Sequence, residues 1–228
     1  MRRTVEDVMT TQVVVVDAEA SFKSIVQLLE KHRISAMPVV DDRGVVIGVV
    51  SEADLLPKQR YPHLQDSLGP ADTLLHRAEL HKARATTAAG LMSRPPITVQ
   101  PGTSVAEAAR LVAKAGVKRL PVVDADGRPV GIVARGDLLE VFLRADEEIR
   151  REVAELVLPD VWADPLAVDV TVRDGVVRLR GQVRHRSLVP VLARMAEEVD
   201  GTVAVQCELG WDVDDTHPTP VAPLRLGR

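Results

Sequence analysis

The chain has 228 residues, a net charge of −4 and 46% hydrophobic residues, a globular composition that excludes disordered and collagen-like proteins. Its single cysteine, Cys207, excludes an internal disulfide framework and argues against a multi-thiolate metal site. No apolar run approaches the ~20 residues of a membrane-spanning helix, the acidic N-terminus does not fit a secretory signal, and no segment is basic enough to favour nucleic acid. We therefore expect a cytoplasmic protein.

An internal repeat organises the first part of the chain. When the sequence is shifted by 83 residues, residues 9–56 align with residues 92–139 without a gap. The identical pairs include residue types that mark turns and helix ends: Met9/Met92, Ser21/Ser104, Pro38/Pro121, Gly44/Gly127, Gly48/Gly131 and Asp54/Asp137. The chain therefore contains a duplicated unit.

Each copy predicts the order β-α-β-β-α. Apolar runs at 13–16 and 97–99 suit buried strands, and Ser21 and Ser104 suit helix N-caps. Apolar residues then recur at helical spacing: Phe22, Ile25, Val26 and Leu29, matched by Val105, Ala108, Ala109 and Val112. Next comes a hairpin, 37–40 with 46–50 or 120–123 with 130–133, which turns at a glycine that takes positive φ (Gly44 or Gly127). A short helix that carries Asp54 or Asp137 completes the unit.

The hairpin and short helix resemble a CBS domain. The runs that carry the resemblance are MPVVD at 37–41 with GVVSEAD at 48–54, and RLPVVD at 119–124 with GIVARGD at 131–137. The likeness covers residues 5–145. It implies two motifs packed about a pseudo-twofold axis, and a homodimer.

The junction between the hairpin and the short helix also suits a nucleotide. A helix N-terminus attracts phosphate, Ser51 adds a hydroxyl, and Asp54 offers carboxylate oxygens to the two ribose hydroxyls. Gly48 leaves room for close approach of a ligand. The resemblance to nucleotide-binding CBS pairs implies that Asp54 holds ribose and Ser51 phosphate, with adenine between apolar strands near Val14 and Pro38.

The second copy differs at this junction. Ala134 stands where the first copy has a serine, while Asp137 is retained. Lys118 and Arg119 precede Pro121, at positions where related CBS modules carry phosphate contacts. We predict that both cations reach phosphate in a cleft shared by the two copies.

Two interpretations of these motifs stay open. Ser51 and Asp54 form an adenosine site or a simple helix cap, and either copy could hold the ligand. The candidate ligands are AMP, ADP, ATP and S-adenosylmethionine, with no cofactor required. Because the sequence shows no catalytic motif, we expect a non-enzymatic protein.

An insert at residues 59–87 separates the copies. Pro57, Pro62, Gly69 and Pro70 predict a loop from residue 57 through the first half of the insert, and residues 72–88 predict a helix. His63, His76 and His81 lack the i,i+4 spacing of a helical metal site, so we expect solvated histidines and no metal. The insert is a candidate to lie over the cleft or to mediate dimer contacts.

The C-terminal part predicts the order α-β-β-α-β. Apolar residues at helical spacing end before Pro159, and alternating strands flank the hairpin signal Asp174-Gly175. A second helix and a last strand follow. The segment 147–211 resembles a BON domain through DGVVRLRG at 174–181 and VDGTV at 199–203, which implies contact with phospholipid or another macromolecular surface.

A basic patch is the candidate contact surface of this segment: Arg178, Arg180, Arg184 and Arg186. Residues 147–213 contain eight arginines against thirteen acidic residues, which favours an ordinary solvated face. The alternation of the last strand places Cys207 on the apolar side, in a packing role. Residues 212–228 suit a flexible tail.

The sequence thus predicts a mixed protein (α+β or α/β), with CBS motifs at 1–58 and 88–145 and a BON domain at 147–211. The leading hypothesis is a regulatory CBS pair that binds an adenosine ligand and relays its state to the BON domain. The alternative is a scaffold that dimerises through the CBS pair and attaches to a surface or membrane through the BON domain.

Overall fold

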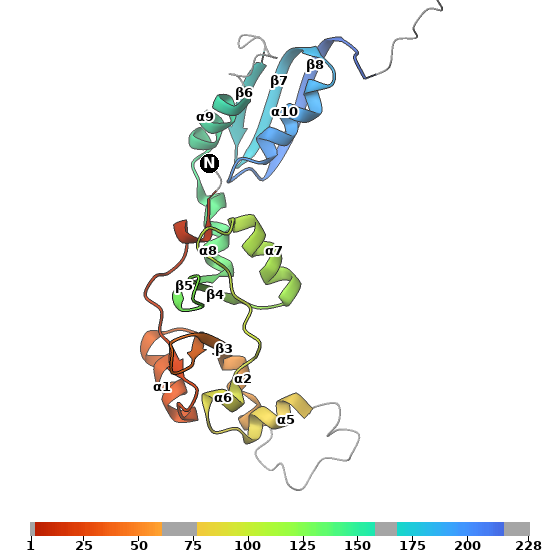
Figure 1. Ribbon diagram of the computed structural model, residues 1–228. Helices are drawn as coiled ribbons and strands as arrows, with labels where there is room; N and C mark the ends of the chain where they lie inside the picture. The colour runs from red at the N-terminus through yellow and green to blue at the C-terminus, as the bar shows by residue number, and fades with distance from the viewer. Residues whose placement is uncertain (1–2, 61–76, 158–167, 217–228) are drawn as a thin grey trace, which may run out of the picture. The chain divides into compact units, whose positions relative to one another are not determined.

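The structure is a computed structural model that describes residues 3–60, 77–157 and 168–216. The chain divides into two compact units (Figure 1). The first unit spans Arg3–Leu138 and contains both repeats, and the second begins at Leu139. None of the described helices is both long and apolar enough to cross a membrane.

The first repeat has the predicted order of elements, and the second has it except for its first strand. The first contains β1 (Val16–Asp17), α1 (Phe22–His32), β2 (Ala36–Val40), β3 (Val46–Ser51) and α2 (Glu52–Leu55). The second contains α7 (Val105–Ala115), β4 (Arg119–Val123), β5 (Pro129–Ala134) and α8 (Arg135–Leu139). Two short helices, η1 (Val5–Asp7) and α6 (Ala88–Leu91), precede the repeats. The predicted first strands are shorter than expected: of residues 13–16 only Val16 lies in β1, and Val99 forms a single bridge to Val122.

The local signals of the repeats are confirmed. The hydroxyl of Ser21 accepts a hydrogen bond from the Ser24 N–H at 3.2 Å, and that of Ser104 accepts one from the Glu107 N–H at 3.3 Å. Gly44 and Gly127 turn the two hairpins with φ values of 79° and 78°. Val26, which the helical spacing places on the apolar face of this helix, is 39% exposed, so the buried face of α1 is narrower than the predicted one and centres on Ile25 and Leu29.

The two repeats exchange their entry segments. Thr10 pairs with Ile132 of β5 through N–O distances of 2.9 and 3.0 Å, and Ser93 pairs with Val49 of β3 through distances of 2.8 and 3.1 Å. Each entry segment therefore lies against the last strand of the other repeat. This arrangement brings the segment before one repeat to the helix junction of the other.

The exchange explains a repeated glycine. Met92 packs on Gly48, with its Cγ only 2.8 Å from where a Cβ would stand, and Met9 packs on Gly131 in the same way. The space at Gly48, which the sequence analysis assigned to a ligand, is therefore filled by a methionine of the protein itself. This expectation was wrong because the partner of the glycine comes from the other repeat.

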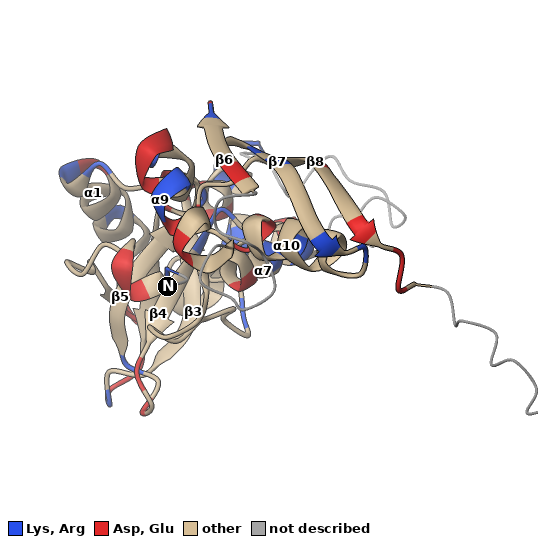
Figure 2. Cartoon of the chain, turned by 90° about the horizontal axis from the view of Figure 1, so that it is seen from above, with Lys and Arg blue, Asp and Glu red and all other residues tan. Residues whose placement is uncertain are grey.

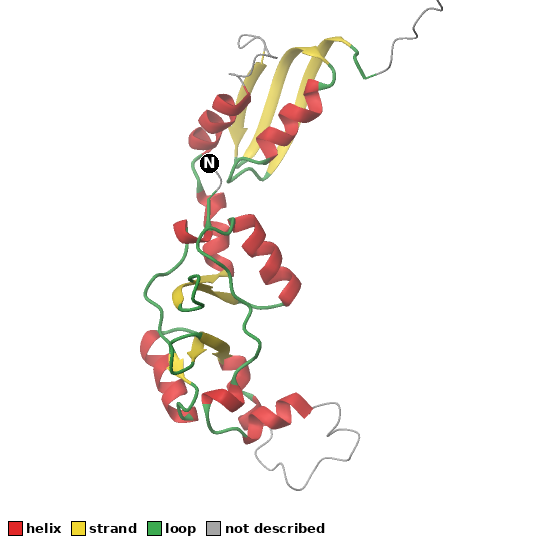
Figure 3. Cartoon of the chain, viewed as in Figure 1, coloured by secondary structure: helices red, strands yellow, loops and turns green. Residues whose placement is uncertain are grey.

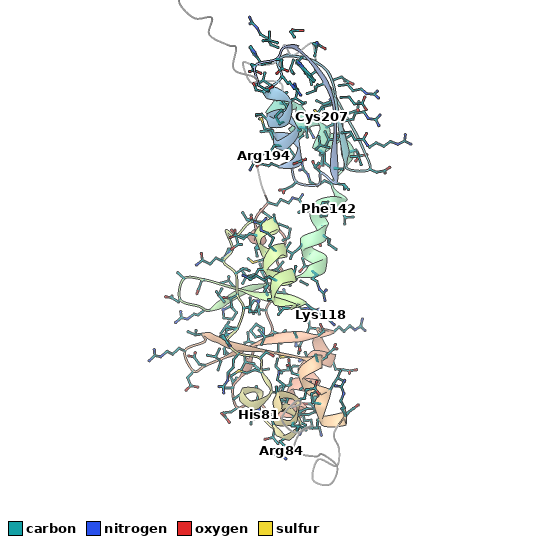
Figure 4. All side chains as sticks on the ribbon, turned by 90° about the vertical axis from the view of Figure 1, so that its right-hand side faces the viewer. His81, Arg84, Lys118, Phe142, Arg194 and Cys207 are labelled. Atoms are coloured by element: carbon teal, nitrogen blue, oxygen red, sulfur yellow. The ribbon has the colours of Figure 1, made fainter. Side chains whose placement is uncertain are left out.

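The insert contributes two described helices, α3 (Pro57–Arg60) and α5 (Arg77–Arg84). The prediction of a loop from residue 57 is wrong at its start, because Pro57 opens α3; proline suits the first turn of a helix, where no amide hydrogen is needed. The helix predicted over 72–88 is described from Arg77 and ends at Arg84. His81 is exposed on α5 (Figure 4), whereas His63 and His76 lie outside the described residues.

The second unit has the predicted α-β-β-α-β order after a short helix, η2 (Glu140–Leu143). Its elements are α9 (Asp146–Val157), β6 (Val168–Arg173), β7 (Val176–His185), α10 (Leu188–Glu197) and β8 (Ala204–Val213). Strand β7 is central, antiparallel to β6 and parallel to β8. Both helices cover one face of this sheet (Figures 1 and 3), and together with it they enclose an apolar core.

The predicted hairpin turn of the second unit is confirmed at Asp174 and Gly175, which have φ values of 50° and 73°. The carboxylate of Asp146, at the start of α9, accepts both of their N–H groups at 2.8 Å and so ties the turn to the helix. Two expectations about β8 are wrong. Cys207 is exposed and does not have a packing role, and the strand extends to Val213, inside the predicted tail. Residues 217–228 of that tail lie outside the described residues.

Candidate ligand-binding site

Two cavities in the first unit are related by the repeat. The first, of about 320 Å³, lies at the β3–α2 junction and is bounded by Ser51, Asp54 and the segment 95–97. The second, of about 220 Å³, lies at the β5–α8 junction and is bounded by Asp137 and the segment 12–14. Each cavity therefore combines the junction of one repeat with the entry segment of the other.

Asp54, in the first cavity, has both carboxylate oxygens fully engaged. Its Oδ2 accepts the N–H of Ser51 at 2.8 Å and the Ser51 hydroxyl at 2.6 Å, which closes a capping box on α2. Its Oδ1 accepts the ammonium of Lys82 and, at 3.2 Å, the hydroxyl of Ser93. Because a carboxylate offers about four acceptor positions, none is left for a ribose hydroxyl.

Asp137, in the second cavity, makes far fewer contacts. Its Oδ2 accepts the N–H of Ala134 at 2.7 Å, and its Oδ1 has no hydrogen-bond partner among the described residues. The side chain is also half-buried, whereas Asp54 is 8% exposed. Asp137 therefore retains acceptor positions that Asp54 lacks.

The difference between the two aspartates has a cause in the sequence. The serine of the first junction is an alanine in the second, so the second cap lacks a hydroxyl. Lys82 belongs to the insert, and no described lysine or arginine makes the equivalent contact at the second junction. The serine that suggested a phosphate contact in the first copy is instead bonded to Asp54, as the capping interpretation expects.

The apolar residues that were expected to contact adenine do not lie together in one cavity. Val14 lines the second cavity, with Asp137, because the entry segments are exchanged. Pro38 and Pro121 are buried within β2 and β4 and are not among the residues that line either cavity. Ile97, which the repeat offset relates to Val14, takes the place beside Asp54. Sequence reasoning missed Ile97, although the offset could have indicated it.

The two predicted cations lie at the cavities. Lys118 is exposed and borders the first cavity, and Figure 4 shows its side chain directed outward. Arg119 is half-buried and borders both cavities. The structure thus brings a guanidinium group close to the walls that carry each aspartate.

The arginines of the predicted patch on the second unit are largely compensated. Arg180 forms an ion pair with Glu208 at 2.7 Å, and Arg178 lies 3.6 Å from the same carboxylate. Arg186 pairs with Asp214 at 2.6 Å and also stacks on a tryptophan ring. Figure 2 shows the acidic end of β8 beside the basic end of β7. Among the described residues, only Arg184 of the four shows no acidic partner, so the structure favours a solvated face.

Within the ranges 3–60, 77–157 and 168–216, no three His, Cys, Asp or Glu side chains gather as a group able to hold a metal ion.

Comparison with known proteins identifies the fold of both units. The CBS-domain family profile matches residues 5–60 and 88–144, and the BON-domain profile matches residues 145–211. An uncharacterized protein of Methanocaldococcus jannaschii, MJ1426, is 32% identical over 154 residues, which cover 61% of this chain and 90% of that protein. The chain belongs to the CBS-domain family. Its CBS pair is followed by a BON domain, as the resemblance predicted.

This CBS-domain protein is also similar to plant relatives. It is 32% identical over 162 residues to CBSX2, a chloroplastic CBS domain-containing protein of Arabidopsis thaliana, covering 65% of this chain and 66% of CBSX2. The crystal structure of CBSX2 in complex with AMP matches with a TM-score of 0.53 and 34% identity, over 61% of this chain and 96% of that chain. The match lies in the CBS-pair fold, which carries both cavities.

Proposed function

We propose that the CBS pair binds an adenosine-containing ligand in the second cavity, with Asp137 as the ribose acceptor. The observation that carries this proposal is the Oδ1 of Asp137, which has no partner within the described part of the chain and lies in a cavity that Arg119 also borders. Val13, Val14 and Ile132 supply apolar wall for a base. The AMP complex of CBSX2 supports the class of ligand.

The charge of the cavity favours a phosphorylated ligand. Arg119 is a guanidinium group that can form charge-assisted bonds to phosphate oxygens. AMP, ADP and ATP carry such groups, whereas S-adenosylmethionine carries a positive sulfonium at the corresponding end. We therefore expect the nucleotides to bind more tightly than S-adenosylmethionine.

Calorimetric titration with the four ligands tests this proposal. AMP should bind the full chain, and Asp137→Ala should weaken binding by about tenfold or more, since it removes the acceptor of two hydroxyl bonds. Asp54→Ala is the matched control and should leave this affinity unchanged. Absence of heat with every ligand at millimolar concentration would remove the proposal.

We further propose that the bound state is relayed to the BON domain through the chain after Asp137. That aspartate lies on α8, which continues directly into η2. Arg144, just after η2, donates to the carbonyl of Asp200 at 2.7 Å and pairs with Glu152 of α9 at 2.8 Å, so this end is fixed to the BON domain. A ligand can shift such a connection only if it binds one arrangement more tightly than another.

Hydrogen exchange of the full chain tests the relay. Saturation with AMP should change amide protection in η2 and in the first turn of α9. The same ligand added to the Asp137→Ala variant should leave these amides unchanged. Altered protection confined to the cavity walls would contradict the relay while leaving the ligand site intact.

We infer a regulatory rather than catalytic protein that acts as a homodimer. Two exposed leucines at equivalent repeat positions support association: Leu56 is 57% exposed and Leu139 is 60% exposed. If nucleotide binding fails while dimerisation persists in sedimentation experiments, the scaffold function with a dimeric CBS pair is the better description. Replacement of both leucines by glutamate should then yield a monomer.

A further inference from the structure

Lys82 of the insert occupies the acceptor that the first repeat would otherwise offer to a ligand. Its ammonium contacts Oδ1 of Asp54 and donates to the Ser93 hydroxyl at 3.0 Å. The pair is well shielded, with side-chain exposures of 21% for Lys82 and 10% for Asp54. It connects residues that are 28 positions apart in the sequence.

Helix α5 holds this lysine in place. Leu80 and Ala83 are buried on its inner face, at 6% and 9% exposure. The ammonium of Lys58, on α3, donates to the carbonyl of Ala83 at 3.0 Å, and Arg60 pairs with Glu79 at 3.3 Å. The helix therefore presents Lys82 to Asp54 as part of a packed element.

We propose that Lys82 is an internal occupant of the first ligand site, which excludes ribose from Asp54 until α5 moves away. This inference rests on the proposed function, because it assumes that the repeat aspartates are ribose acceptors. The reason is that all acceptor positions of the Asp54 carboxylate are used. Its Oδ1 accepts from the Lys82 ammonium and the Ser93 hydroxyl, and its Oδ2 accepts from the N–H and hydroxyl of Ser51. A diol that enters the cavity must displace the ammonium.

The tethered ammonium competes strongly for physical reasons. It is attached to the same chain, so its effective concentration at Asp54 is high and independent of protein dilution. The apparent affinity of the site for a ligand falls in proportion to the fraction of molecules in which Lys82 is withdrawn. Among the residues that the structure describes, no ammonium or guanidinium group contacts Asp137 in the second site. The two sites of one CBS pair are thus expected to differ in their apparent affinity for a ligand.

The experiment isolates the first site by working in full-length Asp137→Ala protein. This variant should bind AMP about tenfold or more weakly than wild-type protein, by calorimetry. Adding Lys82→Met, which keeps most of the side-chain stem but removes the charge, should raise the affinity of this variant about tenfold or more, with one AMP bound per chain. Adding Asp54→Ala to that pair should abolish this gain in affinity.

Arg84→Met is the matched control, because Arg84 is an exposed cation on the same helix (Figure 4). In the Asp137→Ala background it should restore nothing. Lys82→Gln provides a second uncharged variant, and the three remaining hydrogen bonds to Asp54 keep the cap of α2 intact. Urea unfolding of each variant verifies that it is folded.

The outcomes separate this inference from the proposed function. If wild-type protein binds AMP through Asp137 but neither Lys82 variant restores binding, the internal occupant is refuted and the ligand site stands. If the Lys82 variants lower affinity, Lys82 is a ligand contact and the inference is equally wrong. If wild-type protein and every variant fail to bind, both the proposed function and the inference fall.

Discussion

Met92 lies so close to Gly48 that any larger residue at position 48 would displace the methionine side chain, where the entry segment of one repeat meets the last strand of the other. The same relation holds between Met9 and Gly131. Both partners of each contact are identical in the two repeats, so the duplicated sequence encodes the contact between the copies as well as the fold of each copy.

This contact predicts the result of Gly48→Ala. The added methyl group would overlap Met92, and overpacking of this kind lowers the free energy of unfolding by about 1–3 kcal/mol. In a Met92→Ala background the same substitution should cost much less. Urea unfolding of the four proteins in this cycle measures the coupling. Strictly additive costs would contradict the direct contact.

Ala134→Ser should weaken AMP binding rather than strengthen it. The new hydroxyl is expected to bond to Asp137 as Ser51 bonds to Asp54, and so to use an acceptor that the ribose needs. The loss of one hydrogen bond, about 0.5–1.5 kcal/mol, corresponds to roughly twofold to tenfold weaker binding. Calorimetry measures this, and Ala134→Val controls for added volume. Tighter binding by the serine variant would show that the hydroxyl contacts the ligand.

Arg178→Ala with Arg180→Ala should not change sedimentation with anionic phosphatidylserine vesicles. Both arginines are already compensated by Glu208, and exposed pairs of this type contribute about 0–1 kcal/mol to stability. Glu208→Gln removes the compensation and should increase vesicle binding, because each arginine near an anionic surface contributes about 1 kcal/mol. A loss of vesicle binding in the double arginine variant would instead support the hypothesis that the basic patch contacts a membrane surface.

The carboxyl group of Asp214 should titrate at unusually low pH. The hydroxyl of Thr216, followed by the guanidinium of Arg186, lowers the pKa of Asp214 from 3.8 to about 2. Since the folded pKa is depressed, the stability from these contacts is present above pH 3.8 and is lost as the pH falls through about 2. Carbon-detected NMR titration should show that Thr216→Val and Arg186→Met each raise this pKa. An unchanged pKa in Thr216→Val would contradict the assigned cause.

The fold was accessible from the sequence because its signals are local or repeated. Ser21 and Gly44 act within a few residues of their own positions, and their counterparts 83 residues later repeat the same roles. The order of elements follows from such signals. The exchange of entry segments could not be predicted, because Thr10 and Ser93 carry no local mark of the strand that each joins.

The candidate site was predictable only in part, for a related reason. The sequence locates Asp54 and Asp137 at helix junctions, but the availability of each carboxylate depends on groups that arrive from elsewhere. Lys82 reaches Asp54 across 28 positions, and Glu208 reaches Arg180 across another 28. No periodicity or motif in the sequence indicates such pairings. The different surroundings of Asp54 and Asp137 could therefore not be predicted from their identical residue type.

Arg119 is a single guanidinium group that borders two cavities. When a phosphate in one cavity binds to Arg119, the positive charge available to a phosphate in the other cavity decreases. Two nucleotides bound at once would therefore divide one counterion, and the second would bind less tightly than the first. If both cavities bind nucleotides, negative cooperativity would follow from the position of one side chain, without any change in backbone structure.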